Sequence, residues 1–524
     1  MDQREQKRRL LKSTFAVSGP TVLSRILGYC RDMIQAFYLG TSRGADAFTV
    51  AYIIPNLLRR LTGEGTMTAA FVPIFTQVKK EKSKEELWKF ANTFFYDLTL
   101  LIALLAVLGI VLSPLLVKII AFGYKQAPGK LELTIVLTRI MFPYIFLISL
   151  AALAMAILNS LHKFAVPALT PALFNLAIIT LAVVFARKME EPAYIFAVGI
   201  VVGGLFQIAF QLPFLWKKGM RFTFGLSFAQ PAIRKVAMLM VPGIFGVGIT
   251  QINIAVSRML ASLLEEGSVS SLYYATRIRE LALGLFSIAL SIALLPLFSE
   301  QAAHRDIAGM KKTLIFSLKL IFFITFPAMV GLLVLNRPIV QVLFQRGLFG
   351  AQSTTMSATC LLFFSIGLPF ISSAKILAPV FYSLKDTKTP VIIAFFVMTV
   401  YLLLSFILMN PLKVGGLALA LSLAEAFNLL LLFFFLERKI GKVEKKEIFS
   451  SALKSAFSAA SMGAVIWFLI EQVDFQKLEF LSQLGALFGT ILLGVLTYVL
   501  LSLLFNNQDL KSLKDILSKE RIVR

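Results

Sequence analysis

Several apolar stretches of this chain are long enough to cross a membrane and nevertheless contain charged side chains. The first is LSRILGYCRD at residues 23–32, in which Arg25, Arg31 and Asp32 stand among leucine, isoleucine and glycine. A charged side chain at the centre of a bilayer costs roughly 2.5–3.5 kcal/mol even on the most lenient insertion scale. Charges placed there indicate a water-filled cavity, a ligand site or an ion pair between helices.

The charges at membrane depth are mostly basic, and most of the basic ones are arginines. Acidic residues at comparable depth are fewer, so some of the basic side chains would have no acidic partner within the fold. The planar guanidinium fork of arginine suits bidentate binding of phosphate. The pattern therefore predicts a cavity that binds a polyanion, lined by Arg25, Arg31, Arg59, Arg60 and Arg277, with the acids Asp32, Asp46, Glu64 and Glu280 nearby. Isolated basic residues are instead expected to fix helix packing, namely Arg139, Arg258, Lys319 and Lys375.

Helical spacing places these charges on shared faces. In the first apolar stretch, Thr21, Arg25, Gly28 and Asp32 fall within about 60° of one another around a helix axis, together with Ser18. A second polar face contains Tyr273, Arg277, Glu280 and Gly284. Between them, Asn56, Arg60, Gly63 and Glu64 align only if the helix stays regular, and Pro55, Gly63 and Gly65 predict a kink there.

Composition defines the class of protein that must position these residues. Of 524 residues, 58% are hydrophobic and 15% are charged, whereas soluble domains contain about 25% charged residues. The chain is therefore expected to be a polytopic membrane protein. Two cysteines and two histidines, far apart, predict neither a disulfide framework nor a metal site. No ATP-binding loop and no catalytic acid pair or triad is recognisable, so we expect neither a cofactor nor an enzymatic activity.

Apolar stretches of about 20 residues predict fourteen transmembrane helices. They centre near residues 26, 60, 103, 147, 174, 204, 247, 285, 323, 368, 399, 424, 460 and 492. Most basic loop residues lie on the side of both termini, which the positive-inside rule makes cytoplasmic. The net charge of +24 is thus read as a topology signal and not as nucleic-acid binding. The basic N-terminus precedes no cleavage site, so the first helix is expected to remain uncleaved.

A parallel internal repeat relates the two halves of the chain. Gly44 matches Gly267, VPIF at 72–75 matches LPLF at 295–298, and SLHKFAVP at 160–167 matches SLKDTKTP at 383–390, at the same offset. The expected fold is therefore all-α, with two six-helix lobes plus two C-terminal helices around a central cationic cavity. The predicted boundaries are residues 1–222, 223–440 and 441–524.

Three motifs resemble those of a known family. LSRILGYCRD (23–32), DAFTVAYIIPNLLRRLTGEGTMTAAFVPIF (46–75) and YYATRIRELALG (273–284) are similar to segments of the MurJ/MviN lipid II flippases, members of the multidrug/oligosaccharidyl-lipid/polysaccharide exporter superfamily. The resemblance covers essentially the whole chain. It implies that lipid II, the undecaprenyl-diphosphate-linked disaccharide-pentapeptide, is flipped from the inner to the outer leaflet of the bacterial cytoplasmic membrane by alternating access. The resemblance also implies that proteins of cell-wall synthesis could be partners of the chain.

The resemblance assigns site residues by motif. The family's cavity arginines fall on Arg25, Arg31, Arg59, Arg60 and Arg277, its acids on Asp32, Asp46 and Glu64, and Ser24 and Asn56 lie within the same motifs. The chain has Thr276 where the family usually has an acid, so Glu280 is the expected substitute. Residues 236–262 and 390–410 contain no acid, so the sodium site of some members is not carried over. The family's last two helices imply a groove for the lipid tail.

Other functions remain open from the residues alone. A flippase for another polyprenyl-diphosphate-linked glycan would share this charge pattern. A cation-coupled drug exporter of the same superfamily would favour acids in its cavity. A membrane-embedded glycosyl- or phosphotransferase would expose clustered acids in loops, whereas Glu81, Glu85 and Glu86 are interleaved with lysines.

Overall fold

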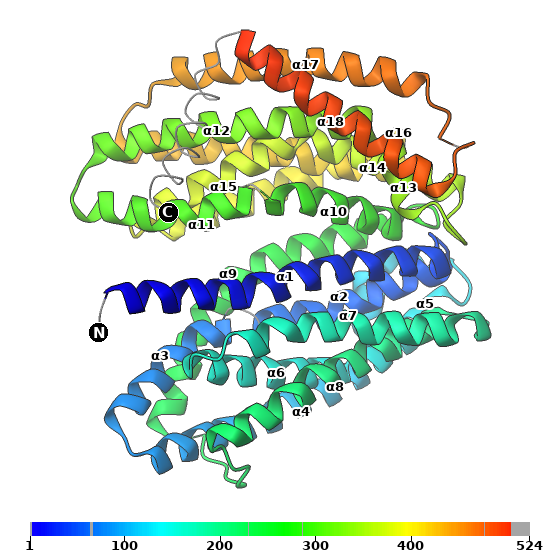
Figure 1. Cartoon of the computed structure of the whole chain (residues 1–524). Helices are drawn as coiled ribbons and strands as arrows, with labels where there is room; N and C mark the ends of the chain where they lie inside the picture. The colour runs from blue at the N-terminus through cyan, green and yellow to red at the C-terminus, as the bar shows by residue number, and fades with distance from the viewer. Residues whose placement is uncertain (1–2, 63–65, 229, 286, 476, 505–524) are drawn as a thin grey trace. The chain divides into compact units, whose positions relative to one another are not determined.

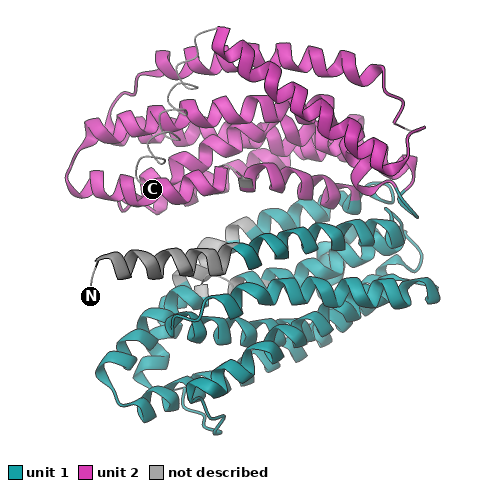
Figure 2. Cartoon of the chain, viewed as in Figure 1, with its two compact units in different colours: residues 1–270, 346–349 teal, residues 271–345, 350–524 magenta. Residues whose placement is uncertain are grey.

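The computed structural model describes residues 3–62, 66–228, 230–285, 287–475 and 477–504, and these residues form helices and short connections without a strand. Each predicted span centre lies in a helix (Figure 1). The all-helical class predicted from the sequence is therefore confirmed. The chain divides into two compact units (Figure 2).

The first unit comprises residues 1–270 and 346–349. Its principal helices are α1 (Gln3–Leu39), α2 (Arg43–Thr62), α3 (Thr66–Glu81), α4 (Lys84–Ile120), α5 (Lys130–Met141), α6 (Pro143–Ser160), α7 (Ala165–Phe185), α8 (Ala193–Lys218) and α9 (Pro231–Ala261), with short 3₁₀ turns at Phe122–Gln126 and Ala186–Lys188. Helix α7 packs between α1 and α8, and α2 packs on α5.

Small residues allow close helix packing in this unit. A Cβ atom on Gly203 would lie 2.7 Å from the ring of Phe174, and one on Gly204 would lie 2.7 Å from the ring of Tyr144. Glycine therefore lets α8 approach α7 and α6 closely, which is the usual basis of helix association in a membrane, where burial of apolar surface gives little advantage.

The second unit comprises residues 271–345 and 350–524. Its helices are α10 (Ser268–Leu285), α11 (Ser287–Ala303), α12 (Ile307–Val334), α13 (Asn336–Phe344), α14 (Ala351–Ile366), α15 (Leu368–Ser383), α16 (Lys388–Ile440), α17 (Lys445–Glu471) and α18 (Phe480–Leu504). Helix α12 packs on α17, and α17 packs on α18. The hydroxyl of Tyr498 donates a 2.7 Å hydrogen bond to the carbonyl of Phe323, which ties α18 to α12. The lobe boundaries predicted from the repeat stay a prediction.

The number of helices that could cross a membrane differs from the number predicted from the sequence. Within the described residues, eight helices are long and apolar enough to cross a membrane, or up to ten if each bent pair is one span. Helices α1 and α2, which contain four of the predicted cavity arginines, are not among them. The predicted centres at 399 and 424 share the 53-residue α16, whose regular path is broken at Lys413 with φ of 50°. The count of fourteen stays a prediction.

Candidate functional site

The polar residues of α1 contact α7. The guanidinium of Arg31 donates to Asp32 Oδ1 from Nη2 at 2.7 Å, and to Asn175 Oδ1 from Nη1 at 3.2 Å. Asn175 in turn donates to the carbonyl of Ser24 at 3.1 Å. Asp32 is fully buried. Arg31 is thus held in one orientation by a carboxylate on its own helix and an amide on α7.

Arg25 differs from Arg31 in its surroundings. It lies on the same helix as Ser24 and is exposed. Among the residues that the structure describes, no ion pair to Arg25 is found. A guanidinium on a helix that has no carboxylate partner can donate hydrogen bonds to the phosphate of a ligand. Ser18, the first member of the predicted polar face of α1, lies where side chains are not described.

The α2 residues predicted for the same site lie near the C-terminal end of that helix. Arg59 donates from Nε to Asn56 Oδ1 at 3.0 Å. Arg60 is half-buried. Glu64, together with Gly63 and Gly65 of the predicted kink, lies outside the described residues. Asn56 therefore orients Arg59 in the way that Asn175 orients Arg31.

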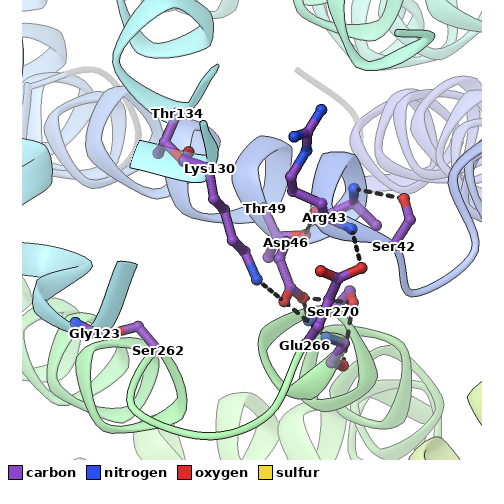
Figure 3. A network of polar contacts seen from close by, with 12 residues as sticks. Ser42, Arg43, Asp46, Thr49, Gly123, Lys130, Thr134, Ser262, Glu266 and Ser270 are labelled. Carbon is purple, nitrogen blue, oxygen red and sulfur yellow. Dashed lines mark hydrogen bonds and ion pairs between the residues drawn. The ribbon is translucent and has the colours of Figure 1, made fainter. Parts of the chain in front are cut away.

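Asp46 lies at the other end of α2, in a network that the sequence did not predict (Figure 3). Its Oδ2 accepts hydrogen bonds from Lys130 Nζ at 2.7 Å and from the amide of Gly267 at 2.9 Å. Its Oδ1 accepts from the amide of Ser270 at 2.8 Å and from its hydroxyl at 2.7 Å. Asp46 is 1% exposed, so the buried carboxylate has its desolvation offset by a cation and three further donors.

The network connects three parts of the first unit. Lys130 is the first residue of α5, and Asp46 lies in the first turn of α2. Gly267 ends the turn that follows α9, and Ser270 lies in the first turn of α10. Gly267 has φ of 88° and a Cβ on it would lie 2.8 Å from the carbonyl of Thr41, so glycine is required there on both counts. The turn between α9 and α10 is thereby fixed to α2.

In the second unit, Arg277 and Glu280 form the ion pair that the sequence predicted. Arg277 Nη1 lies 3.2 Å from Glu280 Oε2, one turn along α10. The two side chains are 31% and 48% exposed, and the guanidinium lies over the ring of Tyr273 at 5.9 Å. Thr276, at the position where the family usually has an acid, donates to the carbonyl of Leu272 instead. The pair is accessible to a ligand. Its predicted position opposite the arginines of α1 and α2 stays a prediction.

Three of the four isolated basic residues expected to fix packing make contacts of that kind, and for Lys375 that role stays a prediction. Arg139 Nε donates to Ser113 Oγ at 3.1 Å, and Arg258 Nη1 donates to the carbonyl of Val269 at 3.1 Å. Lys319 lies 3.7 Å from Glu447. The contacts of Arg139 and Lys319 join helices that pack side by side. The contact of Arg258 ties the end of α9 to the start of α10.

An apolar groove of about 550 Å³ lies between α12, α16 and α17 in the second unit. Phe322, Leu430, Phe433 and Phe434 line it, and Glu437 and Lys445 close one end with a 2.6 Å ion pair. The groove has the apolar lining that a lipid tail requires. One of the two C-terminal helices, α17, forms part of its wall. Among the described residues, no group of three or more His, Cys, Asp or Glu side chains is placed to hold a metal.

Asn175 and Lys130 are the site residues that sequence reasoning missed. Asn175 is the one amide in the apolar stretch 165–185, which is a usable signal, because a polar side chain inside a membrane helix must find a partner. Lys130 follows a glycine in the sequence, where a lysine is expected to be an ordinary exposed loop charge. No local signal distinguishes it from such a charge.

Comparison with known proteins identifies the family. The profile of the family described as Lipid II flippase MurJ matches residues 35–485. A Vibrio cholerae protein named probable lipid II flippase MurJ is 35% identical over 519 residues, covering 97% of this chain and 98% of its own length. A Burkholderia cenocepacia protein named lipid II flippase MurJ is 36% identical over 434 residues, covering 82% and 84%.

Solved structures agree with the sequence comparison. A structure titled as lipid II flippase MurJ in an inward closed conformation has a TM-score of 0.76 and 30% identity, and covers 94% of this chain and 99% of its own. An inward-facing multidrug resistance transporter of the MATE family has a TM-score of 0.68 but 13% identity, covering 80% and 96%. That second likeness shows a shared fold alone.

Proposed function

Because the chain belongs to the MurJ family of lipid II flippases, we propose that it moves lipid II from the inner to the outer leaflet of the bacterial cytoplasmic membrane. Lipid II carries a diphosphate, and the chain offers guanidinium groups on α1, α2 and α10 that a diphosphate can bind through paired hydrogen bonds. The substrate and the bilayer are the partners of this activity. Alternating access, in which the two lobes expose the site to one leaflet at a time, is the expected mode of transport.

Arg25 is the observation that supports this function most directly. It is exposed on α1, without an ion pair among the described residues, and it lies six positions before an arginine that Asp32 and Asn175 orient. In the proposed mechanism, Arg31 keeps its orientation through these partners, while Arg25, Arg59, Arg60 and Arg277 contribute cationic groups to the diphosphate. Asp46 and its network are proposed to support or gate the site, as are Ser24, Asn56, Glu64 and Glu280.

We propose further that flipping involves no covalent change to the substrate, no cofactor and no nucleic acid. Both termini are assigned to the cytoplasm because most basic loop residues lie on their side of the membrane. The apolar groove beside α17 has room for part of the polyprenyl tail.

A depletion experiment tests the function. A bacterial strain whose own lipid II flippase is placed under repressible control would carry either this chain or its Arg25→Ala variant. Outer-leaflet lipid II would be measured after repression by its accessibility to an externally added, impermeant enzyme that cleaves it. We expect the chain to restore accessible lipid II and growth, and the variant to be present in normal amount without restoring either. Accumulation of lipid II on the cytoplasmic leaflet despite normal abundance of the unmodified chain would contradict the proposal.

A further inference from the structure

We propose that a pocket beside the first turns of α4, separate from the arginine site, binds the phosphodiester headgroup of an anionic glycerophospholipid. The pocket has a volume of about 480 Å³ and lies entirely within the first unit. One wall is the face of α4 that contains Glu85, Trp88, Lys89, Asn92 and Thr93. The other wall is the connection between α8 and α9, residues 219–225.

The connection alternates between polar and apolar residues. In RFTFGLSF at 221–228, the even positions are phenylalanine or leucine. The odd positions are arginine, threonine, glycine and serine, which are polar or small. Period-two alternation gives an extended segment two different faces. The structure uses them accordingly: Asn92 donates to Thr223 Oγ1 at 3.4 Å, the amide of Ser227 donates to Asp97 at 3.0 Å, and Phe224 and Phe228 are 77% and 55% exposed. The polar residues thus contact α4, and Phe222 packs on the rings of Phe95 and Trp216, whereas Phe224 and Phe228 keep most of their surface exposed.

Trp88 supplies the observation that points to a ligand. Its side chain is 8% exposed and lines the pocket, yet its indole Nε1 has no hydrogen-bond partner among the described residues. Asn92, one turn along the same helix, likewise has an unpartnered buried Oδ1. A Cβ on Gly219 would lie 3.2 Å from that indole nitrogen, so a side chain there would crowd it. Leaving a buried N–H unpaired costs on the order of 1–3 kcal/mol, and a phosphate oxygen would satisfy it.

Charge selects the kind of headgroup. Lys89 and Arg221 line the pocket against a single acid, Glu85, so the lining has a net positive charge that a headgroup of net negative charge balances. Arginine and lysine together provide a fork and a point charge for phosphodiester oxygens.

The position along α4 favours a lipid over a soluble ion. Leu100, Leu101 and Leu104 of the same helix are 50%, 50% and 56% exposed, which is typical of a helix surface in contact with acyl chains. They begin about 12 Å beyond Asn92, at a rise of about 1.5 Å per residue. The pocket therefore lies where the headgroup of a lipid alongside these leucines would be. Phe224, which is exposed, contacts the ring of Tyr96 on the same helix with 5.2 Å between the ring centroids.

Lipid binding by the purified chain tests this proposal. Native mass spectrometry would follow titration of the delipidated protein with phosphatidylglycerol, with phosphatidylcholine as a zwitterionic comparison. The double variant Lys89→Ala/Arg221→Ala removes both cations of the pocket. Lys217→Ala/Lys218→Ala removes the same charge from exposed neighbours that do not line it. We expect at least about a tenfold loss of phosphatidylglycerol affinity in the pocket variant alone. Equal losses in both variants, or equal affinity of the unmodified chain for both lipids, would overturn the proposal.

Tryptophan fluorescence locates the lipid and distinguishes it from free phosphate. The chain has three tryptophans, so Trp216→Phe/Trp467→Phe leaves Trp88 as the emitter. A phosphatidylglycerol analogue with a headgroup nitroxide should quench it, and about 10 mM inorganic phosphate should not reverse the quenching. This concentration would fill most of a site that binds phosphate with a dissociation constant of about 1 mM, so a soluble-anion site would reveal itself. Reversal by phosphate would assign the pocket to a soluble anion instead. Trp88→Phe keeps an aromatic ring and deletes the N–H, and we expect it to weaken binding; the unfolding temperature, measured in parallel, separates this effect from the lost packing of a buried side chain. Unchanged binding in Trp88→Phe would show that the indole N–H is not a ligand group.

Discussion

Lys130 and Asp46 form an ion pair 2.7 Å long in which the side chains are 5% and 1% exposed. The pair joins α5 to α2. Asp46 also accepts a hydrogen bond from the amide of Gly267, which fixes the turn between α9 and α10. Removing one member of a buried pair leaves the other charge uncompensated, whereas removing both avoids that cost. The energetic role of the pair can therefore be measured separately from any role in transport.

We expect Lys130→Met to destabilise the protein by about 3–5 kcal/mol, because the Asp46 carboxylate stays buried without its cation. Lys125→Met is the matched control, since Lys125 belongs to the same connection and is exposed. Thermal unfolding in detergent would give both values. The double variant Lys130→Met/Asp46→Asn should recover part of the loss. A Lys130→Met protein as stable as the control would show that the pair contributes nothing to the fold.

Local pairs were predictable from the sequence, and long-range pairs were not. Arg277 and Glu280 are three positions apart on a helix, so their contact follows from helical geometry. Arg31 and Asn175 are 144 positions apart, and the contact depends on the packing of α1 against α7, which no local pattern encodes. Lys130 shows the same limit in a different way. A lysine after a glycine turn resembles any loop cation until the fold buries it against Asp46.

The helical framework followed from hydropathy because burial in lipid requires internally hydrogen-bonded helices. The division of helices into spans did not follow as directly. Lys413 interrupts α16 without any glycine at that position, and Pro411 two residues earlier is the nearest sequence signal. The pocket beside α4 was also not predicted. The alternation of polar and apolar residues at 221–228 indicates an extended segment, but not the helix on which it packs.

The connection between α15 and α16 contributes a pH-dependent contact in the second unit. Asp386, between α15 and α16, lies 2.7 Å from Lys439 and accepts hydrogen bonds from the amides of Lys388 and Thr389 at 3.1 and 3.0 Å. Burial on its own raises the pKa of Asp386, but the hydrogen bonds from Lys439 and Thr389 outweigh it and lower the pKa to about 2 from an ordinary value of 3.8.

The sign of the pH dependence follows from that shift. Because the pKa of Asp386 is lower in the folded protein, its contribution to stability is present above about pH 4 and is lost as the pH falls towards about 2. We expect Asp386→Asn to lower the unfolding temperature at pH 7, and the difference from the unmodified chain to shrink between pH 4 and pH 2. Asp474→Asn, at the exposed pair with Lys477, should have little effect at either pH. A constant Asp386→Asn difference across this range would contradict the assignment.

The topology proposal can be tested with impermeant thiol reagents. The native cysteines Cys30 and Cys360 would first be replaced by alanine, and a single cysteine introduced as Lys84→Cys or Glu265→Cys, both at exposed positions. Labelling of intact cells should modify the cysteine at 265 and not that at 84, because the basic loop at 79–89 is assigned to the cytoplasm. Permeabilised cells should show labelling at both. The reverse pattern in intact cells would invert the topology.

Arg277 is expected to bind the substrate rather than to fix packing. Its ion pair with Glu280 is 31% and 48% exposed, and an exposed pair contributes at most about 1 kcal/mol. We therefore expect Arg277→Ala and Glu280→Ala to be present in membranes in normal amount. If Arg277 holds the diphosphate, Arg277→Ala should fail to support growth of a flippase-depleted strain, and Arg277→Lys should fail substantially as well, because a point charge replaces a bidentate fork. If the pair only fixed packing, Arg277→Ala/Glu280→Ala would restore whatever either single variant lost. Membrane abundance and growth measured together separate the two roles, and full growth with the double variant would exclude Arg277 as a ligand residue.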